Sequence, residues 1–239
     1  MHPTYSLIPL ALSALLVATP TLSAGPNGRQ PVQSIQPIVY ELNPADIDDL
    51  TYMHEEERLA RDVYMGLSAY WGDQGWPVLL FDNIARAEQT HMATLKSAMD
   101  RYGLDDSSDP EVVGVYADPT LNDLYETLMK RGMMDTTYME ALRVGALIEE
   151  VDIADLDEAI ARTDNPDLQT IYANLQRGSR NHLRAFVAEI ERQGVNYEAQ
   201  ALEQDTVNAI VDAPMERGGQ GQRDGMGNVQ GKGRGASNT

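Results

Sequence analysis

The sequence predicts an all-α protein: a four-helix bundle with one long crossover and short accessory helices. Between residues 44 and 211, apolar residues recur at intervals of three and four, the period of a helix, and no stretch alternates as a strand does. Short loops join the first long helix to the second and the third to the fourth, whereas a long irregular segment joins the two pairs. Two antiparallel hairpins connected by one crossover follow from these lengths.

The first pair of helices precedes the crossover. We expect the first helix over about 44–71, with Asn43 as its N-cap, because Pro44 suits a first helical position. The segment GDQGWP then turns the chain, and the second helix follows to about Tyr102. The segment GLDDSSDPEVVGVYADP breaks the helical period and supplies the crossover.

The second pair follows a shorter helix, which we expect at about 120–131. The third long helix covers about 135–162, and the tight turn DNP leads into the fourth, about 166–193. A final amphipathic segment, 197–211, is expected to dock on the outside of the bundle.

The two ends of the chain differ in composition from the helical part. Residues 1–24 hold an apolar run followed by small residues, which is typical of a secretory signal peptide, although no Lys or Arg precedes the run and an uncleaved anchor is the alternative. Residues 25–43 form a Pro- and Gly-rich linker, 44–212 the bundle, and 213–239 a Gly-rich disordered tail. We therefore expect an exported protein, periplasmic or secreted, with no stable membrane association after signal cleavage.

Composition excludes several classes of site. The chain has no cysteine, so disulfides, thiolate metal sites, iron–sulfur clusters and a cysteine nucleophile are excluded. Its formal net charge of −19 repels nucleic acid and attracts cations. Metal ions are the partners that this charge favours, and oligomerisation is left open.

Each long helix carries ionisable side chains on its apolar face, where a charge without a partner costs several kcal/mol. Residues three apart lie on one helix face, so Glu88 and His91 can bind the same ion. The candidate metal ligands of the four helices are Glu57, Glu88, His91, Glu149, Asp152 and His182.

The charges of these candidates suggest two ions. Four carboxylates are balanced by two divalent cations when the two imidazoles are neutral. Oxygen and nitrogen donors without sulfur suit iron or manganese, and zinc is a further option. Taken singly, these residues have simpler explanations: Glu57 can pair with Arg61 or Arg86 in a salt bridge, and His182 can be a satisfied core histidine. His54 is expected at the surface. Their joint occurrence in this order favours the metal site.

A family resemblance supports the same site. The segments EEERLARDVY, AEQTH, IEEVDIADL and GSRNHLRAF, in this order over about residues 45–192, resemble DUF2202, a ferritin-like family of bacterial and archaeal domains of unknown function. The spacing is similar to that of rubrerythrin, in the pairs Glu88 and His91 and Glu149 and Asp152. The resemblance implies a ferritin-like fold and a metal centre, but no particular reaction.

One position departs from the ferritin-like pattern. The fourth helix of such proteins usually carries Glu-x-x-His, whereas this chain has Ser179 three residues before His182. Either Asp152 substitutes for the missing carboxylate, or one coordination position is open, or the second metal site is weak.

Two classes of function follow. The first is a di-metal protein, with two iron ions favoured over manganese or zinc, that reacts with dioxygen or peroxide or oxidises iron(II). Electrons would come from the substrate or from an external donor, because a chain without cysteine holds no rubredoxin-type centre. The second is a non-catalytic metal-binding or structural bundle that acts through protein contacts. Whether the protein is an enzyme is open at this level.

Overall fold

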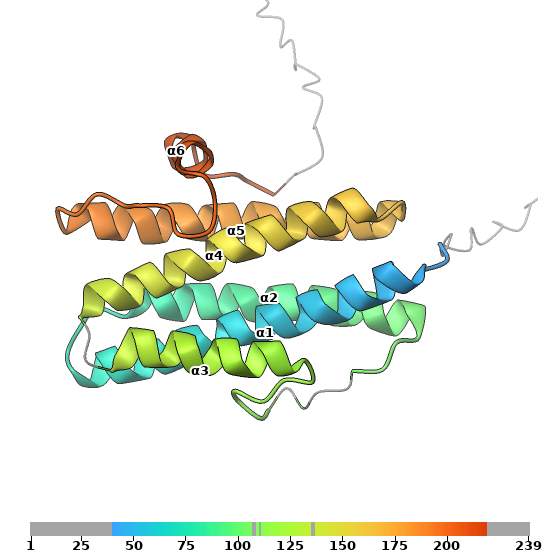
Figure 1. The fold of residues 1–239 in the computed structure, drawn as a ribbon, viewed down its shortest axis with the longest axis horizontal. Helices are drawn as coiled ribbons and strands as arrows, with labels where there is room; N and C mark the ends of the chain where they lie inside the picture. Colours follow the sequence, from blue (N-terminus) through green and yellow to red (C-terminus); the bar gives the residue numbers. More distant parts are fainter. Residues whose placement is uncertain (1–39, 107–108, 110, 135–136, 219–239) are drawn as a thin grey trace, which may run out of the picture. The chain divides into compact units, whose positions relative to one another are not determined.

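The fold is known from a computed structural model, which describes residues 40–106, 109, 111–134 and 137–218. These residues form six α-helices and no strand (Figure 1), which confirms the all-α prediction. The expected signal peptide, most of the expected linker and the tail from residue 219 onward lie outside the described residues. Among the described helices, none is both long and apolar enough to cross a membrane.

The helices correspond closely to the expected segments. In chain order they are α1 (Pro44–Asp73), α2 (Leu79–Tyr102), α3 (Pro119–Met133), α4 (Tyr138–Arg162), α5 (Pro166–Arg192) and α6 (Gln204–Asp212). The four long helices pack as two pairs, α1 with α2 and α4 with α5, and the pairs meet where α1 contacts α4 and α2 contacts α5. The helix α3 lies against α1 and α4, and α6 lies against α5 (Figure 1).

Capping side chains mark where three of the four long helices begin, namely α1, α4 and α5. Asn43 and Asp46 form a capping box at the start of α1, in which each side chain accepts a hydrogen bond from the other residue's backbone N–H, at 3.0 and 2.9 Å. Asn165 caps α5 directly before Pro166. The helix α4 begins later than expected because Thr137 is its N-cap.

The core consists of two apolar clusters. The first cluster is built around Tyr64, Phe81 and Phe186, whose ring centroids lie 5.5–6.3 Å apart. The second is built around residues such as Leu50 and Leu95. On every long helix the candidate metal ligands lie in the chain between residues of one cluster and residues of the other. A polar layer therefore divides the core.

The helix α1 is buried on all sides near its middle. Every residue of the segment Met53–Tyr64 is buried, because α2 and α4 cover one side while α3 and the crossover cover the other. Arg58 donates to the backbone carbonyl of Asp109 at 2.7 Å, and Glu55 accepts from the backbone N–H of Ala117 at 2.8 Å. Charged side chains of α1 thus hold the crossover in place.

The surface position predicted for His54 is wrong. The residue is only 3% exposed, and its Nδ1 lies 3.8 Å from a carboxylate oxygen of Asp106. Helical period alone placed it away from the core, but the crossover covers that side of α1.

The segment after α5 also differs from its prediction. The expected helix at 197–211 begins only at Gln204, and the residues before it wrap around the fully buried Glu150. Its carboxylate accepts the backbone N–H groups of Ala201 at 2.7 Å and Leu202 at 2.8 Å, and the hydroxyl of Tyr197 at 2.5 Å. The backbone N–H groups of Ala201 and Leu202 therefore bond to the Glu150 carboxylate and not to the carbonyls of a helix.

The first residues of the expected tail, 213–218, are described and contact α5. Glu216 accepts hydrogen bonds from Arg180 at 2.6 Å and from Arg184 at 2.9 Å. This contact joins the end of the described chain to the helix that carries His182.

We expect Glu150→Ala to destabilise the protein by roughly 3 kcal/mol or more, since three backbone N–H groups and the buried hydroxyl of Tyr197 would lose their acceptor. Chemical denaturation measures the difference in the free energy of unfolding. The control is Glu126→Ala, at an exposed position of α3, which should change that free energy by less than about 0.5 kcal/mol. Equal effects of the two substitutions would contradict the anchoring role of Glu150.

Candidate metal centre

All six predicted ligands come together in the polar layer between the two apolar clusters. Their carboxylates are almost fully buried, with exposures of 2% for Glu57, Glu88 and Glu149 and 6% for Asp152, and both imidazoles are partly buried. Since α1, α2, α4 and α5 each contribute at least one of them, the layer forms only when the four long helices pack.

Glu57, Glu88 and His91 form the first group of potential ligands, with one donor atom of each lying within 4.8 Å of the others. The Nδ1 atom of His91 lies 2.7 Å from Oε2 of Glu88 and 3.1 Å from Oε2 of Glu57. His91 therefore lies between a carboxylate of its own helix, α2, and a carboxylate of α1.

Glu88, Glu149 and His182 form the second group. The Nδ1 atom of His182 lies 2.8 Å from Oε1 of Glu88 and 3.4 Å from Oε2 of Glu149. Glu88 belongs to both groups, and each of its oxygens faces a different histidine. The two imidazole rings lie 5.6 Å apart, centroid to centroid.

Two buried oxygens of the polar layer lack hydrogen-bond partners within the described ranges and are available as donors. Buried polar atoms normally form hydrogen bonds, yet Oε1 of Glu57 and Oδ1 of Asp152 form none among the described residues. Metal bonds of about 2.1 Å place neighbouring ligand atoms about 3 Å apart, which resembles the separations found here. Oxygen and imidazole nitrogen donors suit iron, manganese or zinc. His182 is not surrounded by apolar residues alone, because its Nδ1 faces the carboxylates of Glu88 and Glu149.

Without a metal, protons balance part of the charge. Burial lowers the pKa of His91, but Glu57 and Glu88 outweigh it and raise that pKa to about 12. Burial likewise opposes the charged form of His182, and Glu88 and Glu149 still raise its pKa well above the usual value. Burial would raise the pKa of Glu88, but the two imidazoles hold it well below its ordinary value. A cation that binds here must replace these protons.

Asp152 lies in the layer but belongs to neither group. The hydroxyl of the fully buried Ser179 donates to its Oδ2, whereas its Oδ1 is buried without a partner. Burial, followed by the charge of Glu149, raises the pKa of Asp152 to about 7. The carboxylate of Asp152, which comes from α4, thus lies beside Ser179 of α5, the position where the ferritin-like pattern would have a glutamate.

Neighbouring residues hold the ligands in position. The hydroxyl of Tyr64 donates to Oε1 of Glu149 at 2.6 Å, which orients that carboxylate. A Cβ atom on Gly178 would lie 2.6 Å from the ring of His91, so the absence of a side chain on α5 makes room for the imidazole.

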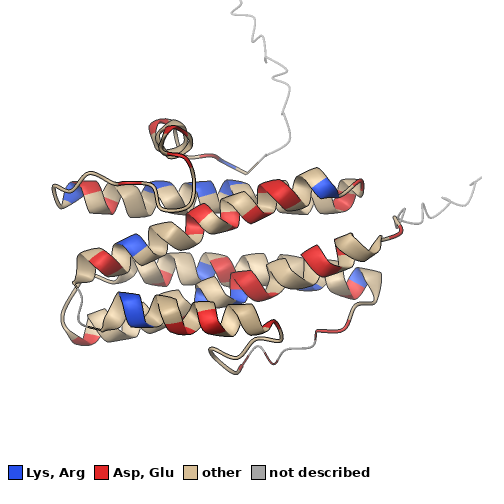
Figure 2. Cartoon of the chain, in the orientation of Figure 1, with Lys and Arg blue, Asp and Glu red and all other residues tan. Residues whose placement is uncertain are grey.

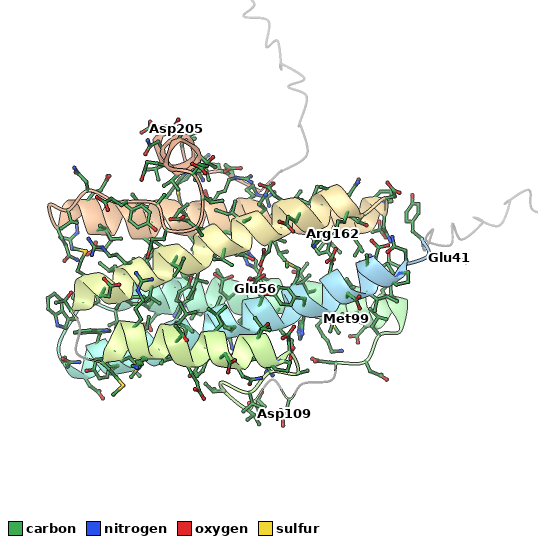
Figure 3. The ribbon with its side chains drawn as sticks, viewed as in Figure 1. Glu41, Glu56, Met99, Asp109, Arg162 and Asp205 are labelled. Atoms are coloured by element: carbon green, nitrogen blue, oxygen red, sulfur yellow. The ribbon has the colours of Figure 1, made fainter. Side chains whose placement is uncertain are left out.

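Sequence reasoning missed Glu56, which is buried between α1 and α4 (Figure 3). Its side chain is hydrogen-bonded to Asp155, and its Oε2 has no partner. It also lines an apolar cavity of about 210 Å³, together with residues of α1, α3 and α4 such as Leu124 and Ile148. Glu56 is buried because α1 is covered on all sides, and the helical period of the sequence does not reveal that covering.

Comparisons with known proteins agree on one family. Residues 46–214 match the model of a family described as "Uncharacterized protein domain (DUF2202)". The chain is 41% identical over 171 residues to "Uncharacterized protein MJ0754" of Methanocaldococcus jannaschii, a match covering 72% of this chain and 89% of the relative. It is also similar to the crystal structure of hypothetical protein MJ0754, with a TM-score of 0.69 and 38% identity over 76% of this chain and 99% of that one.

The shared position of Glu88 predicts unequal effects of two conservative substitutions. Glu88→Gln should remove binding of both ions, whereas Glu57→Gln should remove one and leave the group around His182 intact. The number of Co²⁺ ions bound per chain, measured by equilibrium dialysis and elemental analysis, tests this expectation. Glu126→Gln on exposed α3 is the control for the loss of one charge. If Glu57→Gln and Glu88→Gln lose the same number of ions, Glu88 is not shared.

Metal affinity should rise with pH. In the metal-free protein the pKa values of His91 and His182 are raised, so both imidazoles carry protons near neutral pH. A cation needs the neutral ring, so each proton released raises the apparent affinity up to about tenfold per pH unit. Titration calorimetry with Co²⁺ in buffers of different ionisation enthalpy measures the released protons. Binding without proton release would contradict the pairing of the imidazoles with carboxylates.

Proposed function

The chain belongs to the DUF2202 family, and for it we propose a ferritin-like protein that binds two metal ions, iron before manganese or zinc, and uses them in a redox reaction. The oxidant is dioxygen or peroxide, and iron(II) itself is one candidate substrate. The sharing of Glu88 between two Glu and His groups carries this proposal. A single structural ion would not need two histidines on opposite sides of one carboxylate.

The arrangement of the helices supports the ferritin-like assignment. Two hairpins, α1 with α2 and α4 with α5, are joined by a connection that contains α3, and each contributes potential ligands from both of its helices. In ferritin-like proteins the metal ligands project inward from four such helices.

Each residue then has a role in holding the ions. Glu57 and His91 hold the first, Glu149 and His182 hold the second, and Glu88 contacts both. Asp152, positioned by Ser179, offers its unpartnered Oδ1 in place of the carboxylate that position 179 lacks. When bound as iron(II), the two ions supply two electrons at one site.

The surroundings suit a small apolar oxidant. The cavity beside Glu56 is apolar except for that residue, and dioxygen is favoured in such surroundings over water. Tyr64 keeps Glu149 in place through its hydroxyl, and the two apolar clusters exclude water from either side of the layer. Burial by these clusters strengthens the electrostatic interactions of the site.

Iron(II)-loaded protein, prepared without oxygen, should consume dioxygen or peroxide and develop iron(III) absorption in the near ultraviolet. Glu88→Ala and His91→Ala should each abolish both changes. Each also removes one partner of a buried ion pair, so the metal-free variants should melt at a lower temperature than the wild type, and circular dichroism below that temperature shows that they are folded. An oxygen electrode and absorption spectroscopy provide the two measurements.

Glu126→Ala, which changes an exposed acid, should react as the wild type does. If wild-type protein binds two ions but neither reacts with dioxygen nor with peroxide, the redox proposal fails and a non-catalytic metal-binding protein replaces it. If no ion binds at all, the bundle is structural.

A further inference from the structure

We propose that divalent cations enter the metal centre along a row of carboxylates that begins in an acidic surface pocket between α1 and α4. The carboxylate row consists of Asp155, Glu56 and Asp152, from the surface inward. The inference rests on the proposed function, because it requires a centre that binds cations. It adds the route by which they arrive.

The helix α4 supplies two of the three residues of the row. Glu149, Asp152 and Asp155 follow one another at intervals of three residues, and each step advances about 4.5 Å and falls about 60° short of a full turn. Exposure rises along the series: Glu149 is 2% exposed, Asp152 is 6% exposed and Asp155 is only half-buried. The carboxylates therefore wind from the core toward solvent.

The helix α1 supplies the middle of the row. Glu56 (Figure 3) is 4% exposed. Its side chain is hydrogen-bonded to Asp155, and the charges of Asp152 and Glu57 act on it directly. Carboxylate oxygens are donors for divalent cations, so Glu56 and Asp155 offer donors from two helices to a cation that passes between them. Glu56 thus connects the half-buried acid to a candidate ligand.

Two unpartnered oxygens point to a ligand within this row. Oε2 of Glu56 and Oδ1 of Asp152 are both buried, and neither has a hydrogen-bond partner in the described part of the chain. Leaving a buried acceptor unpaired is costly, so such oxygens are rare without a function or an absent partner. Asp152 belongs to the centre and Glu56 interacts with both Asp152 and Asp155, so a cation that leaves the pocket would meet the oxygen of Glu56 before that of Asp152.

The outer end of the row is a cavity of about 590 Å³. Its ionisable lining residues are Asp48, Asp49, Glu55, Asp118, Asp155 and Arg162. The single guanidinium among five carboxylates is already bound to Asp49 at 2.8 Å and to Glu158 at 2.9 Å. Acidic residues recur along both α1 and α4 (Figure 2), and a cleft lined by one sign of charge concentrates ions of the opposite sign.

The test measures how fast metal-free protein takes up Co²⁺, by stopped-flow absorption of the bound ion. Asp155→Asn removes the charge at the entrance but keeps the size and an oxygen that can accept the hydrogen bond from Glu56. We expect uptake to slow by about tenfold, the lower end of electrostatic effects on association rates, with the same number of ions bound at equilibrium. Asp155→Glu, which restores the charge, should restore the rate.

Asp205→Asn is the matched control. It removes one carboxylate from the exposed surface of α6 (Figure 3) and should leave the uptake rate unchanged. Raising the ionic strength should slow uptake by the wild type more than uptake by Asp155→Asn, because salt screens the charge of the pocket. Melting temperatures of the metal-free variants show whether each is folded.

The outcomes separate the route from the centre. If wild-type protein binds no Co²⁺, the proposed function fails. If it binds two ions and Asp155→Asn takes them up as fast as wild type does, the centre stands and the route is wrong. A loss of bound ions at equilibrium in Asp155→Asn also overturns the route, since Asp155 would then be a ligand.

Discussion

The buried carboxylate of Glu88 is the constraint on which the rest of the structure depends. One oxygen faces His91 at 2.7 Å and the other faces His182 at 2.8 Å, so a residue of α2 is tied both to its own helix and to α5. Charge of this density is stable in a core only when opposite charge lies beside it. The spacing and register of the long helices therefore have to bring the imidazoles, and the ions that we propose, to this one carboxylate.

The division of the core follows from that constraint. Apolar residues cannot share a layer with several carboxylates, so they gather in two clusters, one on each side. The clusters bury enough surface to hold the helices together, while the layer between them specifies how they align. Gly178 and Ser179 show the same requirement on α5, where small side chains leave room for the ring of His91 and position Asp152.

Much of this arrangement could be predicted from the sequence, because local rules govern it. Asn43 and Asn165 cap helices at the expected positions, and the spacing of Glu88 and His91 is sufficient to place them on one face. The missed features depend on which segments cover which side of a helix. Glu56 and His54 are buried by α3, α4 and the crossover, and the segment before α6 leaves the helical form for the carboxylate of Glu150. No periodic pattern encodes such contacts between distant segments.

Glu149 and Glu150 are consecutive on α4 and have opposite surroundings. The first faces the polar layer, and the second is enclosed by the backbone of the segment before α6. Neighbouring residues on a helix point about 100° apart, so the two anchors fix different directions around one axis. Rotation of α4 would break one contact or the other, and sliding would break both. The two contacts oppose both rotation and sliding of α4, so we expect a change in ionic radius at the centre to be accommodated by side-chain rotamers rather than by movement of this helix.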